Sequence, residues 1–225
     1  MVATLMSLLH TGNPIVDLIL VLGSSFAIYM AFHVAVQRMI VSLDCPVELG
    51  NLSLIQQLNV ARDVIARLFV LFFSVSLVVF LTNQVESAPY LLFGLYGIVF
   101  DQTVPAGHVW CAIVAAIIFM MALNAERSTP TTLYNALVEL GRHAVWIIPA
   151  VLAVALLLFA ASYAQALGRV AVVTILAKTG VAGGLWNTIA YFFVLAFAML
   201  RLWGTVAILT IALRESYRRR DAATE

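Results

Sequence analysis

The sequence predicts an all-α protein, a polytopic bundle of about five transmembrane helices in a single membrane domain that covers residues 1–225. Two observations lead to this prediction. Of the 225 residues, 64% are hydrophobic and only 10% are charged, whereas soluble domains carry about 25% charged residues. Apolar stretches of about 20 residues, the length that crosses a bilayer, also recur along the chain. They leave no room for a separate soluble domain. The N-terminus lacks the basic region and cleavage site of a secretory signal, so the first span is expected to remain.

Five segments are long and apolar enough to span a bilayer: residues 15–41, 64–82, 107–124, 144–165 and 185–213. Two further apolar runs, residues 89–100 and 169–177, are too short to span. Each is predicted to be a short outer segment that lies at the interface or re-enters the membrane.

The basic residues predict the orientation, because cytoplasmic loops carry an excess of Lys and Arg. The first and third connections and the C-terminal tail are rich in arginine, whereas residues 83–107 contain no Lys or Arg. The N-terminus is therefore expected outside and the C-terminus inside. Net charge is +1, which gives no reason to expect a nucleic-acid partner.

Two cytoplasmic connections are predicted to form interfacial amphipathic helices that lead into spans. Residues 51–67 place apolar side chains on one helical face, namely Leu54, Leu58, Ala61 and Ile65. In residues 129–143, Thr129 is expected to cap a helix and Pro130 to take its first position.

A shift of 76 positions aligns Trp110 with Trp186 within a shared AGxxW pattern. It predicts two duplicated two-span units, residues 54–124 and 130–213. Chance matching between apolar sequences is the alternative, and the sequence leaves it open.

The first span carries two stripes at helical spacing. One consists of small residues that let a second helix approach closely in lipid: Gly23, Ala27, Ala31 and Ala35. The other is polar: Asp17, Ser25, Tyr29, His33 and Gln37. A polar side chain that faces lipid has no hydrogen-bond partner, at a cost of several kcal/mol, so this stripe should face other helices or a water-filled path.

The fifth span carries a similar polar stripe: Asn187, Tyr191, Arg201 and Thr205. An arginine within a membrane helix must snorkel, pair or reach water. We consider snorkelling toward the cytoplasm, or a charge partner such as Asp17 or Asp101. The C-terminal arginines are interpreted as a topology anchor, with a lipid or partner contact as the alternative: Arg214, Arg218, Arg219 and Arg220.

Nothing in the sequence predicts catalysis or a cofactor. It has no HExxH motif, phosphate loop or thiol pair, so we expect neither an enzyme nor a metal site. A haem held by His33 and His143 is not expected, because His33 should lie about 12 Å deeper in the membrane. His10 and His108 are expected to be solvated on the outer side.

These features favour a non-catalytic subunit of a larger assembly of secretion, conjugation or respiratory type in a bacterial inner membrane. Its expected partners are membrane lipids and other membrane-protein subunits, or further copies of itself. The alternative is a small channel or transporter whose path is lined by the polar residues of the first and fifth spans.

Overall fold

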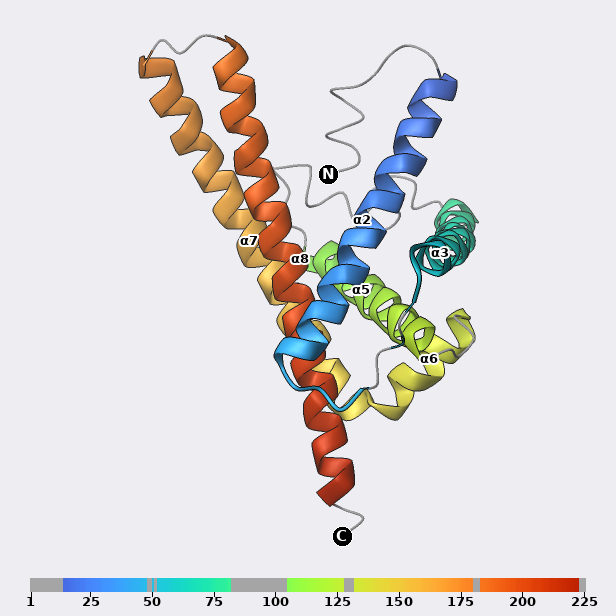
Figure 1. Cartoon of the computed structure of the whole chain (residues 1–225). Coiled ribbons are helices and arrows are strands. Elements are labelled where there is room, and N and C mark those ends of the chain that lie inside the picture. The colour runs from blue at the N-terminus through green and yellow to red at the C-terminus, as the bar shows by residue number, and fades with distance from the viewer. Residues whose placement is uncertain are drawn as a thin grey trace.

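The computed structural model describes residues 14–47, 50, 52–81, 105–127, 132–179 and 183–222. Over these residues the protein is helical and contains no strand (Figure 1). The helices are α2 (Pro14–Ser42), α3 (Leu54–Leu81), α5 (Pro105–Glu126), α6 (Leu133–Arg142), α7 (Ala144–Thr179) and α8 (Gly183–Ala222). The predicted all-α class is confirmed.

Three helices are long and apolar enough to cross a membrane, within the part of the chain that the structure describes. The apolar stretches are Gly107–Glu126 in α5, Ala144–Ile175 in α7 and Thr188–Arg219 in α8. A shorter apolar stretch, Phe26–Ser42, lies in α2. The stretches in α7 and α8 each contain 32 residues and are therefore about 48 Å long. Because the hydrocarbon core is about 30 Å thick, both helices must tilt or extend beyond it.

Helix α5 forms the centre of the bundle. Its second half is almost completely buried, including Phe119, Met120, Met121 and Leu123. It contacts each of the other five helices named above. A helix that is apolar on all sides is suited to such a position, because every face can pack against a neighbour.

Helices α7 and α8 pack side by side along much of their length (Figure 1). Gly204 of α8 allows a close approach at one point: a Cβ atom there would lie 2.5 Å from Cδ2 of Leu157 on α7. Small residues at a contact between membrane helices let the backbones come close and gain packing energy.

Helix α3 is the most peripheral of the long helices. It packs on the bundle through buried residues such as Ala61 and Val64, whereas both of its ends expose large apolar side chains: Leu54, Ile55, Leu58, Val70, Phe73, Leu77, Val78 and Leu81. Figure 1 shows α3 nearly end-on, while α2, α7 and α8 lie close to the plane of the view. The axis of α3 is therefore steeply inclined to the axes of these three helices.

Several predicted boundaries are wrong. Residues 169–177 do not form a separate outer segment, because α7 continues unbroken to Thr179. The interfacial helix predicted over residues 51–67 and the span predicted over 64–82 are one helix, α3. Helix α6 is capped by Thr132, whose side chain accepts a hydrogen bond from the Asn135 amide at 3.1 Å. Thr129 and residues 89–100 lie outside the described residues.

The two predicted repeat units differ in helix continuity. In the first, α3 runs unbroken from Leu54 to Leu81, whereas in the second the chain turns at His143 between α6 and α7. The pairs also differ in packing, since α7 lies along α8 but α3 meets α5 over a short region. The duplication stays a prediction.

Candidate functional site

The polar stripe of α2 meets the C-terminal end of α5 at His33 and Gln37. His33 is 1% exposed and Tyr29 is 5% exposed. The His33 Nε2 atom lies 2.8 Å from Oε1 of Glu126, and Gln37 Nε2 donates to the same oxygen at 2.6 Å. The Tyr29 ring stacks on His33 with 6.0 Å between ring centroids. One carboxylate of α5 therefore holds two side chains of α2.

The Glu126 side chain is fully buried, with 0% exposure. The loop between α2 and α3 covers it, and a Cβ atom on Gly50 would lie only 2.6 Å from the Glu126 carbonyl oxygen. A buried carboxylate is costly unless it is paired and hydrogen-bonded. His33 forms an ion pair with it when protonated and a hydrogen bond when neutral and correctly oriented. This contact is the buried α2–α5 cluster: Tyr29, His33, Gln37 and Glu126.

Glu126 was missed by the sequence analysis, although a signal was present. It follows directly after the apolar segment 107–124, at the cytoplasmic end of the third predicted span. Gln37 and His33 belong to the cytoplasmic half of the first. A comparison of the predicted membrane depths of polar residues on different spans would have paired Glu126 with His33 and Gln37.

The opposite face of α2 carries the predicted small-residue stripe. Gly23, Ala27 and Ala31 are exposed, and only Ala35, at 1% exposure, is buried. A Cβ atom on Gly23 would meet no atom of the described residues within 4 Å. The side chains of Asp17 and Ser25 lie outside those that the structure describes.

A second polar cluster joins α5, α7 and α8. Arg201 Nη2 donates to Gln165 Oε1 at 2.6 Å and to Ser162 Oγ at 3.3 Å. Ser162 Oγ also lies 3.2 Å from Nε2 of His108. Gln165 is 1% exposed and His108 is 3% exposed. Two neutral side chains of α7 thus accept hydrogen bonds from the guanidinium. We call the following residues the Arg201 cluster: His108, Ser162, Gln165 and Arg201.

This cluster corrects one prediction and leaves others untested. His108 is not solvated: it is buried, hydrogen-bonds to Ser162 and meets the Phe159 ring edge-on at 5.6 Å. Thr205, one turn from Arg201, is buried. Asp101 and the side chains of Asp17, Asn187 and Tyr191 lie outside the described residues.

An apolar section of α5 separates the two clusters. His108 and Glu126 lie about 27 Å apart along the helix at the usual rise per residue. Asn124, close to Glu126, is buried and polar, but the buried side chains from 109 to 123 are apolar, among them Ala112, Ala116, Phe119 and Met120. Within the described residues, α5 therefore offers no continuous polar path from one cluster to the other. The described part of the chain also contains no group of three or more metal-ligating side chains.

Helices α6, α7 and α8 meet at the end of the bundle near the C-terminal end of α8. His143, between α6 and α7, lies with Nδ1 2.7 Å from Ser216 Oγ of α8, and its ring meets Tyr217 at 5.1 Å. Arg127 donates a hydrogen bond to the Tyr217 hydroxyl. His33 and His143 thus contact different partners, Glu126 and Ser216. Arg214, Arg218 and Arg219 are exposed at the end of α8, and the Arg220 side chain lies outside the described ones.

Cys45, in the loop after α2, packs against the same end of the bundle. It is 7% exposed, and burial raises the pKa of its thiol to about 11, although Arg127 and Arg214 act in the opposite direction. A thiol of this kind is mostly protonated at neutral pH and behaves as a small apolar side chain.

The fold and these buried contacts define a class: an all-helical protein whose long apolar helices are suited to a membrane and are fastened by polar side chains. No family model, no curated protein and no solved structure matches the chain.

Proposed function

We propose that the protein is a non-catalytic subunit of a larger assembly in a bacterial inner membrane, of secretion, conjugation or respiratory type. In this proposal α5, α7 and α8 cross the membrane and the C-terminus lies in the cytoplasm, whereas the steep inclination of α3 to α2, α7 and α8 leaves the five-span count a prediction. The exposed arginines at the end of α8 act as a cytoplasmic anchor. The partners are other membrane subunits or further copies of the chain.

The observation that carries the proposal is the difference between the two faces of α2. The polar face is buried against α5, whereas Gly23, Ala27 and Ala31 on the small-residue face are exposed. Small residues at this spacing allow a helix to pack closely in lipid. Since no described helix of this chain covers them, a helix from another subunit is the occupant that we propose.

Helix α3 supports the same proposal. Both of its ends expose large apolar residues, among them Phe73 at 72% and Leu81 at 72%. Lipid can cover such a surface, but the steep inclination of α3 and its limited contact with the bundle leave it well placed to pack on a neighbouring subunit.

Transport is the second candidate, and the buried polar clusters favour it. Ionisable side chains inside membrane helices often mark ion or proton pathways, and Glu126, His33 and Arg201 are such residues. The apolar section of α5 between the clusters weighs against a path along that helix. In proteoliposomes, transport predicts a flux that His33→Ala or Arg201→Ala reduces, whereas a structural subunit shows no flux.

The subunit proposal is tested by gentle isolation of the full chain from native membranes, followed by mass spectrometry of the associated proteins. The wild type should retain a stoichiometric partner, and Ala27→Phe should lose it because the bulky ring prevents close helix packing. Ala160→Phe is the matched control, since Ala160 is an exposed alanine on α7, and it should keep the partner. A wild-type chain that isolates as a stable monomer would contradict the proposal.

A further inference from the structure

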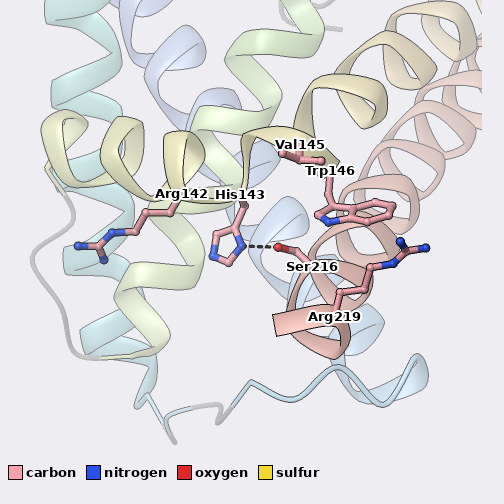
Figure 2. Close-up of a pocket in the computed structure, with 6 residues that line it drawn as sticks. All are labelled: Arg142, His143, Val145, Trp146, Ser216 and Arg219. Carbon is pink, nitrogen blue, oxygen red and sulfur yellow. Dashed lines mark hydrogen bonds between the residues drawn. The ribbon is translucent and has the colours of Figure 1, made fainter. Parts of the chain in front are cut away.

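A pocket lies where α6, α7 and α8 meet, at the end of the bundle that carries the exposed arginines. It has a volume of about 500 Å³ and is lined by Arg142, His143, Val145, Trp146, Ser216 and Arg219. Figure 2 shows Trp146 and Arg219 on one side of His143 and Arg142 on the other, with His143 directed at Ser216. Both guanidinium groups point away from Ser216, so these long, exposed side chains must turn inward to contact a ligand beside it. Among the described residues, the lining contains two arginines and no carboxylate, although Oε2 of Glu139 lies 3.7 Å from Nε2 of His143.

The polar groups of the pocket are suited to a phosphate. A guanidinium offers several donors in a planar fork that matches phosphate oxygens. The Ser216 hydroxyl can donate as well when His143 carries a proton on Nδ1 and donates to Ser216.

Both arginines of the pocket form ion pairs with acidic neighbours. Arg142 Nη1 lies 2.6 Å from Glu139, and Arg219 Nε lies 2.9 Å from Glu215. The arginine side chains are 63% and 67% exposed, and pairs this exposed contribute little energy. Each contact uses one nitrogen of the guanidinium, so further donors remain for a ligand.

The apolar surroundings indicate which phosphate compound occupies the pocket. Val145, a lining residue, begins a row of exposed aliphatic side chains along α7: Val145, Ile148, Leu152 and Leu156. This row leads from the pocket along the apolar stretch Ala144–Ile175. Arg219 lies over the Trp146 ring, 4.6 Å from its centroid, and tryptophan prefers the headgroup level of a bilayer. A polar pocket that continues into an apolar row fits a lipid and not a soluble phosphate.

We propose that this pocket binds the headgroup of an anionic glycerophospholipid, with the phosphate between Arg142, Ser216 and Arg219 and an acyl chain along the row that starts at Val145. Basic pockets between membrane helices on the cytoplasmic side bind such lipids in general. The site differs from a diffuse contact of the C-terminal arginines, because it requires Arg142 of α6 and involves only Arg219 of that group. It is independent of whether the protein is a subunit or a transporter.

The test is native mass spectrometry of the full chain in detergent, titrated with phosphatidylglycerol or with phosphatidylcholine of the same acyl chains. The wild type should retain phosphatidylglycerol in preference to phosphatidylcholine. The double variant Arg142→Gln/Arg219→Gln should bind phosphatidylglycerol about tenfold more weakly or worse, because two charges near the membrane surface are lost. Binding of phosphatidylcholine should not change.

Arg62→Gln, combined with Arg38→Gln, is the matched control. Arg62 is 68% exposed and paired with Asp63 at 3.1 Å, much as the pocket arginines are paired, and Arg38 is exposed on α2. This control removes the same charge outside the pocket and should bind phosphatidylglycerol as the wild type does. Circular dichroism and gel filtration should show that both double variants are folded, and Ser216→Ala gives a milder change within the pocket.

Three results would overturn the proposal. The first is equal loss of phosphatidylglycerol in the pocket variant and the control, which would mean a diffuse electrostatic contact. The second is wild-type binding by the pocket variant. The third is displacement of the lipid by inorganic phosphate at similar concentration, which would assign the pocket to a soluble phosphate. Inorganic phosphate is expected to compete poorly, because it cannot use the apolar row.

Discussion

The two buried polar clusters both hold polar side chains inside an apolar helix bundle, but they do so with different chemical groups. In the α2–α5 cluster, a fully buried carboxylate is held by a histidine and an amide, so each helix needs the other to satisfy its polar groups. In the Arg201 cluster, a guanidinium is held by neutral acceptors on α7, and its side chain is only partly buried. Removal of one partner should therefore lower the free energy of unfolding much more in the first cluster than in the second.

The largest expected effect is that of Glu126→Ala. It leaves His33 buried and Gln37 half-buried without the oxygen that they share, so the free energy of unfolding should fall by about 3 kcal/mol or more. Unfolding in mixed micelles followed by circular dichroism measures this. The double variant Glu126→Ala/His33→Ala should cost clearly less than the sum of the single changes, whereas additive losses would show that the two side chains do not act together.

A change at Gly50 probes the same cluster from the loop that covers it. A Cβ atom would lie 2.6 Å from the Glu126 carbonyl oxygen, so Gly50→Ala should cost about 1–3 kcal/mol through overpacking. Gly23→Ala is the control, because a Cβ atom there meets no described atom within 4 Å. Equal stability of the two variants would contradict the close approach of the loop to α5.

Arg201→Gln should have a smaller effect, about 1 kcal/mol or less, because hydrogen bonds between membrane helices contribute on average about 0.6 kcal/mol. Glutamine is shorter and uncharged, so the contacts to Gln165 and Ser162 are lost while no charge is left buried. The same unfolding experiment measures it. A loss as large as that of Glu126→Ala would mean that the two clusters do not differ as described.

The smallest expected effect is a local one, on the reactivity of the Cys45 thiol. Because burial raises its pKa to about 11, little thiolate is present at pH 8, and the rate of alkylation should rise about tenfold per pH unit until it levels off near pH 11. Iodoacetamide labelling in a Cys111→Ser background measures this rate, with the SDS-denatured chain as control. A plateau near pH 9 in the folded protein would show that the thiol is solvated.

How much of this the sequence reveals is clear from α2 and α5. Helical periodicity places Tyr29, His33 and Gln37 on one face, and the cost of unpaired polar groups predicts that this face is covered. Periodicity does not say which helix covers it, so Glu126 was missed. Similarly, a search for acids near Arg201 overlooked Gln165 and Ser162, because neutral side chains give no charge signal.

The predicted helix boundaries were wrong for a different reason. An apolar run ends in the sequence where composition changes, but a helix ends where its backbone hydrogen bonds can no longer continue or a cap replaces them. Residues 169–177 follow a polar interruption and still continue α7. Among several threonines before α6, Thr132 provides the cap, a choice that local composition does not predict.

The difference between the two faces of α2 is tested most directly by photo-crosslinking in native membranes, with a photoreactive amino acid at position 27, 31 or 160. Positions 27 and 31 should give a defined adduct with another protein or a second copy of the chain, and position 160 should give lipid adducts only. Lipid adducts alone at all three positions would contradict a partner helix on the small-residue face.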